Sequence, residues 1–69
     1  MQQFELKDHE YIELNSLLKL TGITGSGGMA KVLIADGQVM VDGAVELRKR
    51  CKIRSGQTVA FQDETIEVI

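Results

Sequence analysis

The sequence predicts an α+β fold in which two helices pack on a small antiparallel sheet. Two segments in the first half carry apolar residues at helical spacing and are joined by a glycine-rich stretch. The second half alternates apolar and polar residues, as strands do, and its first strands flank an Asp-Gly pair that favours a tight hairpin. A chain of 69 residues has room for one core, so we expect a single domain over residues 1–69.

A short strand over residues 2–6 and a helix over residues 11–21 are expected first. The strand alternates apolar and polar residues, and Gly22 is suited to end the helix. Residues 11–14 would also suit an extended entry, so two starts remain open. Lys19 lies away from the apolar stripe. That stripe repeats at spacings of three and four and consists of Tyr11, Leu14, Leu17 and Leu18.

The second helix is expected from Met29 to the residue before Gly37. Ser26 is the best N-cap, because its hydroxyl can accept a hydrogen bond from a backbone amide of the first turn. Lys31 falls on the outer face of this helix. The glycine-rich residues 24–28 before it allow two interpretations, a plain flexible turn or a site for one phosphate of a larger ligand.

Strands are expected through most of the second half. Asp42-Gly43 suits a type I′ turn, in which both central residues need positive φ. If the alternation continues to residue 54, Lys49 shares one face with Val45, Leu47, Cys51 and Ile53. The opposite face then carries Glu46, Arg48, Arg50, Lys52 and Arg54. A turn at Ser55-Gly56 leads into two closing strands, residues 58–61 and 65–69.

Charge is distributed unevenly along the chain. The formal net charge is −2, but residues 1–28 and 55–69 together carry −5, while residues 29–54 carry +3. Five of the eight basic residues lie within residues 48–54. Alternate side chains on a strand are about 6.6 to 7 Å apart, close to the spacing of successive phosphates, so this segment could bind a phosphate backbone. The alternative is an edge strand whose charges prevent pairing between molecules.

Catalytic and metal-binding patterns do not emerge from the sequence. Cys51 is the single cysteine, and we interpret it as a small core residue rather than a reactive thiol. His9 stands between two acidic residues, with no partner for nucleophilic chemistry. We expect no catalysis, cofactor, metal or membrane association, and a cytoplasmic location. The aromatic residues are all assigned to apolar faces, which disfavours base stacking.

Residues 14–59 resemble the S-four RNA-binding domain family. The stretches that carry this resemblance are LNSLLKLTGI, SGGMAKVLIADGQVMVDG and CKIRSGQTV. The segments LLKL, AKVLIADGQV, VDGAVE and RKRCKI are similar to a free-standing group in that family, the YbcJ-like bacterial proteins. The resemblance implies an alpha-L motif, two helices against a small antiparallel sheet, and binding of structured RNA, double-stranded or ribosomal, by a monomer.

Two positions depart from the family pattern. Gly27 stands where an arginine usually follows the cap serine, and Ala44 stands where a cation usually follows the turn glycine. We expect the basic segment and Lys31 to compensate. The expected RNA-binding residues are Lys19, Ser26, Lys31, Arg48, Lys49, Arg50, Lys52 and Arg54. The alternative function is a protein-interaction adaptor that docks an acidic partner on the same basic segment.

Overall fold

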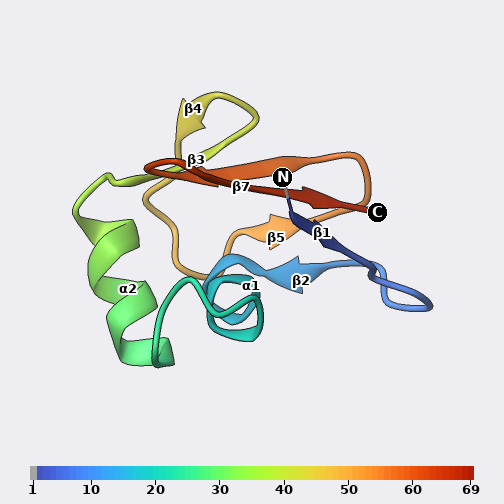
Figure 1. Ribbon diagram of the computed structural model, residues 1–69, viewed down its shortest axis with the longest axis horizontal. Helices are drawn as coiled ribbons and strands as arrows, with labels where there is room; N and C mark the ends of the chain where they lie inside the picture. Colours follow the sequence, from blue (N-terminus) through green and yellow to red (C-terminus); the bar gives the residue numbers. More distant parts are fainter. Residues whose placement is uncertain (1) are drawn as a thin grey trace.

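A computed structural model gives the fold and describes residues 2–69. Two helices pack beside an antiparallel-rich sheet, which confirms the predicted α+β class (Figure 1). The elements, in chain order, are β1 (Gln2–Phe4), β2 (Ile12–Glu13), α1 (Leu14–Leu20), α2 (Gly27–Ala35), β3 (Val39–Val41), β4 (Ala44–Val45), β5 (Lys52–Ile53), β6 (Thr58–Phe61) and β7 (Glu64–Val68).

The larger sheet has five strands in the order β1-β7-β6-β3-β4. All its neighbours are antiparallel except β1 and β7, which run parallel, with Gln2 opposite Ile66 and Phe4 opposite Val68. The predicted small antiparallel sheet is therefore confirmed, with one parallel pair added at this edge. The parallel pair places the first and last strands of the chain side by side (Figure 1).

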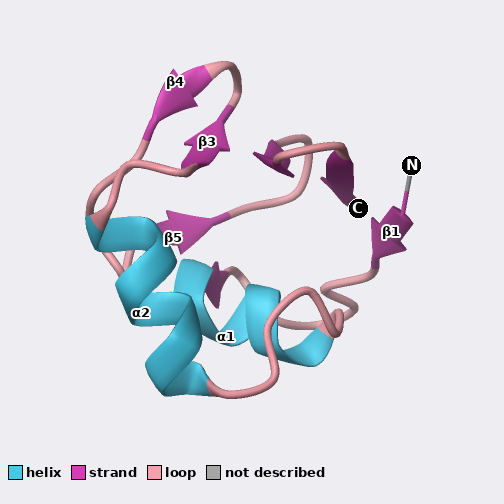
Figure 2. Ribbon diagram, turned by 60° about the vertical axis from the view of Figure 1, so that its left-hand side comes forward, coloured by secondary structure: helices cyan, strands magenta, loops and turns pink. Residues whose placement is uncertain are grey.

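A second, two-stranded sheet lies between the helices and the larger sheet. It consists of β2 and β5, paired antiparallel with Ile12 opposite Ile53 and Glu13 opposite Lys52. Figure 2 shows β5 between the two helices and the β3–β4 hairpin. Ile53 is fully buried and Ile12 packs against the same core, so this small sheet turns one side inward and the other outward.

Both helices begin where local signals direct them. The extended entry at residues 12–13 is correct, since these residues pair with β5, and α1 therefore starts at Leu14 rather than at residue 11. Ser26 caps α2 as predicted, because its Oγ accepts a hydrogen bond from the amide of Met29 at 3.2 Å. This cap allows α2 to begin at Gly27, two residues earlier than predicted.

The Asp42-Gly43 turn has the predicted geometry, with φ of 51° and 84°. The carboxylate of Asp42 also accepts hydrogen bonds from the amide of Thr58 at 2.9 Å and from the side chain of Gln57 at 3.2 Å. The turn is thus attached to the start of β6. The hydrophobic core consists of Leu6, Leu14, Leu17, Leu18, Ala30, Ile34, Val39, Val41, Ile53, Val59, Ile66 and Val68.

Candidate nucleic-acid interface

Residues 46–51 form a loop, which we call the basic loop, between β4 and β5. The prediction that strand alternation continues to residue 54 was wrong here, because regular pairing stops at Val45 and resumes only at Lys52. Within the loop, the amide of Cys51 donates to the carbonyl of Arg48 at 3.1 Å, which closes a turn. Leu47 in the loop is 61% exposed, and Val45 in the paired strand β4 is 56% exposed, so neither faces the core.

The start of α1 explains why this segment leaves the strand conformation. The first amides of a helix have no acceptor within the helix. The amide of Leu14 donates to the carbonyl of Cys51 at 2.9 Å, and the amide of Asn15 donates to the carbonyl of Lys49 at 3.0 Å. The N-cap residue Glu13 makes no side-chain cap. The carbonyls of the basic loop therefore cap α1, and this fixes the loop through its main chain.

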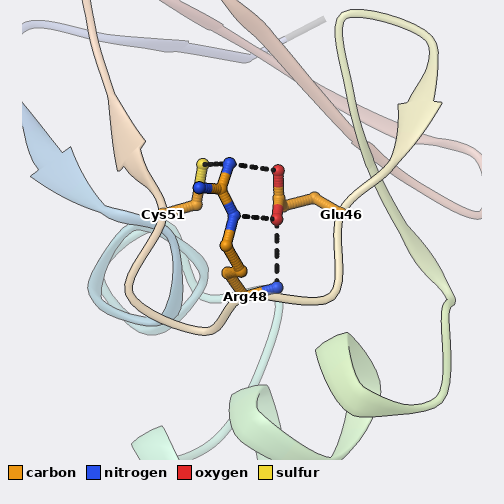
Figure 3. A network of polar contacts seen from close by, with 3 residues as sticks. All are labelled: Glu46, Arg48 and Cys51. Atoms are coloured by element: carbon orange, nitrogen blue, oxygen red, sulfur yellow. Dashed lines mark hydrogen bonds and ion pairs between the residues drawn. The ribbon is translucent and has the colours of Figure 1, made fainter.

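Side-chain contacts among Glu46, Arg48 and Cys51 also hold the loop in place (Figure 3). Nε of Arg48 donates to the carboxylate of Glu46 at 2.9 Å, and Nη2 contacts Sγ of Cys51 at 3.8 Å. The hydrogen bonds from Arg48 lower the pKa of Glu46 to about 2, and the same carboxylate raises the pKa of Arg48. Burial raises the pKa of the Cys51 thiol, which opposes thiolate formation at neutral pH.

Three cations of the loop region surround one shallow depression of about 350 Å³. Its lining consists of Arg48, Arg50, Cys51 and Lys52. Arg48 is partly neutralised by Glu46, whereas the side chains of Lys49 and Arg50 make no hydrogen bond or ion pair with any residue in the range 2–69. A site of this composition can accept an anionic oxygen cluster such as a phosphate, because guanidinium groups offer paired donors to it.

The outer side of the β2–β5 sheet carries an aromatic ring beneath two cations, one of which, Lys52, also lines the depression. Nζ of Lys52 lies 5.0 Å from the centroid of the Tyr11 ring, and Cζ of Arg54 lies 5.8 Å from it. Tyr11 is 37% exposed. Its assignment to an apolar face was wrong, because the chain enters α1 as a strand. In the extended alternative for residues 11–14, neighbouring side chains point to opposite sides of the strand. Tyr11 then lies on the outer side, opposite Ile12, and this alternation is the sequence signal that could have placed it there.

The remaining predicted residues lie on the two helices. Lys19 occupies the last turn of α1, Lys31 is exposed on α2, and Ser26 caps α2 with its side chain. In the part of the chain that the structure describes, no polar side-chain contact links them to the basic loop. The eight predicted residues thus form two groups: five on the basic loop and around β5, and three on the helices.

Over residues 2–69, no group of three or more His, Cys, Asp and Glu side chains is placed to hold a metal ion. Neither of the described helices has the length and apolar character needed to cross a bilayer.

Comparisons with known proteins agree with the fold and with the predicted resemblance. The family model of the S4 domain matches residues 4–69, so the chain belongs to the S4 domain family. YbcJ of Escherichia coli (strain K12) and YbcJ of Shigella flexneri are each 55% identical to it over 69 residues, covering all of this chain and 99% of either relative.

A solved structure extends this likeness to three dimensions. The solution structure of YbcJ from E. coli matches with a TM-score of 0.78, covering 100% of this chain and 87% of that one, at 55% identity. That structure is described as revealing an alpha-L motif involved in RNA binding. The predicted similarity to the S-four family and its YbcJ-like group is therefore confirmed.

Proposed function

We propose that this chain is a non-catalytic module that binds structured RNA through the basic loop and the outer side of β5. The observation that carries the proposal is the depression lined by Arg48, Arg50 and Lys52 on a loop whose backbone is fixed by α1. Membership of the S4 domain family supports it, as does the alpha-L motif described as involved in RNA binding in E. coli YbcJ.

The cations would act on the RNA backbone rather than on base edges. A-form helices are recognised largely by shape and by phosphate and 2′-hydroxyl contacts, since their major groove is too narrow for side chains. Lys49 and Arg50 can bind phosphates without first breaking a contact described for residues 2–69. Arg48 uses Nε and Nη2 for Glu46, which leaves Nη1 for an RNA oxygen.

The three predicted residues on the helices, Lys19, Ser26 and Lys31, would provide a second, weaker contact with the RNA. Lys31 is exposed on α2, and Ser26 lies at the start of the same helix, where backbone amides favour an anion. Lys19 stands before the connection that leads to this start. Lys31, together with the cations of residues 48–54, would compensate for the two missing family contacts at Gly27 and Ala44. Ribosomal RNA is the candidate target, bound by a monomer in the cytoplasm.

The test is a binding titration of a labelled RNA hairpin, followed by fluorescence anisotropy over a range of salt concentrations. About four or five phosphate contacts predict that log K falls with log salt at a slope of roughly −3 to −4. The variant Lys49→Gln/Arg50→Gln should keep the wild-type melting temperature and lose about tenfold or more in affinity. Its salt slope should flatten by about 1.4 to 1.8, because two phosphate contacts are gone.

A matched control changes two charges elsewhere. Glu64→Gln/Glu67→Gln alters the strand β7 and should leave affinity and salt slope close to the wild-type values. Binding to the hairpin that ignores both salt and the loop variant would defeat the proposal. Failure to recover crosslinked RNA with the protein from its host would favour an acidic protein partner instead. Crosslinking and sequencing of the RNA bound in the host would identify the target, and light scattering would give the oligomeric state.

A further inference from the structure

We propose that Tyr11, Lys52 and Arg54 bind one unpaired nucleotide of the RNA, with its base in the apolar groove beside Tyr11 and its phosphate on the two cations. This inference rests on the proposed function and specifies the ligand more closely: a duplex interrupted by an unpaired nucleotide, rather than a continuous duplex.

The register of the β2–β5 sheet creates the cationic half of this subsite. Ile12 and Ile53 face each other and pack on the inner side, so their chain neighbours project outward. Lys52 and Arg54 are two residues apart on that outer side, and both lie over the Tyr11 ring, at 5.0 Å and 5.8 Å from its centroid. Two cations and a partly exposed ring are therefore held together by strand geometry.

The second half of the subsite is a groove that Tyr11 also lines. This open groove has a volume of about 750 Å³ and lies between the N-terminal segment and α1. Its apolar walls are Phe4, Leu6, Tyr11, Ile12 and Leu20. Leu20 is 66% exposed, so its side chain is accessible to a ligand in the groove. Tyr11 is thus shared between an apolar groove and a pair of cations.

The combination favours a nucleotide over other occupants. A nucleobase is planar and apolar on its faces, and it is joined to an anionic phosphate a few ångströms away. Tyr11 has apolar neighbours in the groove on one side and two cations within 6 Å of its ring. A base in the groove could therefore have its phosphate at these cations. Glu13 lies opposite Lys52 on this face, and the groove is lined by one carboxylate, Glu5, and one ammonium, Lys7. Cations therefore remain in excess of carboxylates. An apolar peptide helix would use the groove but leave the cations without an anion.

An unpaired nucleotide is required because a paired base cannot reach such a groove. Bases inside an A-form helix are stacked and enclosed, whereas bulged or looped bases can be turned out and stacked on aromatic side chains. Stacking of one base on an aromatic ring typically changes affinity by about fivefold or more. The basic loop lies next to β5 in the chain, so a duplex bound there can present a bulge to Tyr11.

The experiment compares two RNA hairpins that differ only in one bulged adenosine. The wild-type protein should bind the bulged hairpin at least about fivefold more tightly than the fully paired one. Tyr11 is the single tyrosine of a chain without tryptophan, so its own emission reports on the subsite without any substitution. We expect the bulged hairpin to quench this emission more strongly than the paired hairpin at equal saturation.

Two variants separate the ring from its surroundings. Tyr11→Leu, which keeps apolar bulk, should abolish the preference for the bulge, measured as the ratio of the affinities for the two hairpins. Tyr11→Phe should retain the preference. Equal binding and equal quenching of the two hairpins by the wild-type protein would overturn this inference while leaving the proposed function intact. Failure to bind either hairpin would instead overturn the proposed function, and with it the subsite.

Discussion

The carboxylate of Glu46 accepts three hydrogen bonds from Arg48, one from its backbone amide at 3.0 Å and two from its guanidinium at 2.9 Å and 3.2 Å. The Glu46 side chain is only 16% exposed, whereas that of Arg48 is 77% exposed. Arg48 is therefore both a surface cation and a support of the loop that presents it. The side chains of its neighbours Lys49 and Arg50 have only the first of these roles, and Lys49 supports the loop through its main-chain carbonyl alone.

This pairing predicts a loss of stability in acid. The pKa of Glu46 is about 2 in the folded chain, below its ordinary value of 4.5, because Arg48 donates hydrogen bonds to the ionised form. The unfolded chain binds more protons between these two values. The contribution of Glu46 is therefore fully present above about pH 4.5 and is lost as the pH falls toward about 2.

Thermal melts of the wild type and of Glu46→Gln over this pH range would measure the effect. The difference between their melting temperatures should shrink as the pH is lowered, since the wild type alone loses the ionised carboxylate. Melting curves that keep a constant separation down to about pH 3 would contradict the assignment.

Ser26 should have separable roles in stability and in RNA binding. Ser26→Ala removes the acceptor for the amide of Met29 and should lower the free energy of unfolding by about 1 kcal/mol. Ser26→Asp keeps an acceptor and should restore that stability, but its negative charge should weaken RNA binding if a phosphate approaches the start of α2. Urea unfolding and the hairpin titration measure the two effects. Unchanged affinity in Ser26→Asp would remove Ser26 from the interface.

The tight turn gives a prediction about backbone conformation. Gly43 has φ of 84°, a region that β-branched residues strongly disfavour. Gly43→Val should therefore destabilise the protein by about 1 to 3 kcal/mol. Gly43→Asn is the control and should cost less, because asparagine tolerates positive φ. Both are measured by urea unfolding, and equal stability of the valine variant and the wild type would be the contrary result.

Cys51 should react slowly with thiol reagents. Its side chain is partly buried against the core, and burial raises the pKa of the thiol. We expect alkylation at neutral pH to be slower than that of a free cysteine and to accelerate as the pH rises or when urea unfolds the chain. Mass spectrometry of timed samples gives the rates. Rapid labelling of the native protein would assign Cys51 to a reactive site instead.

Features specified by neighbouring residues could be predicted from the sequence, and those that depend on distant partners could not. The Asp42-Gly43 turn and the Ser26 cap each follow from the chemistry of a few adjacent residues. The basic loop depends on α1, whose amides recruit carbonyls more than thirty residues away in the chain. Apolar and polar residues continue to alternate through residues 46–51, which predicts a strand. Periodicity alone could not reveal that the carbonyls of this segment accept hydrogen bonds from the start of α1.

The candidate site shows the same division. A run of basic residues is visible in the sequence itself, so the cations of the basic loop could be predicted as candidate binding residues. The position of Tyr11 depends on whether residues 11–13 enter α1 as helix or as strand, and the pairing of Ile12 with Ile53 decides this. Glu46 was recognised as a neighbour of the cations, but its bonds to Arg48 required the turn that the loop makes.

The capping of α1 by the carbonyls of Lys49 and Cys51 has a consequence for how this surface can be altered. Every amino acid carries the same carbonyl, so the path of the loop is largely independent of which side chains occupy positions 49 and 50. Natural variation or protein engineering can therefore rewrite the charge and hydrogen-bonding character displayed at these positions while the scaffold stays the same. Positions 49 and 50 can therefore vary, while the contact between Glu46 and Arg48 keeps the loop in place.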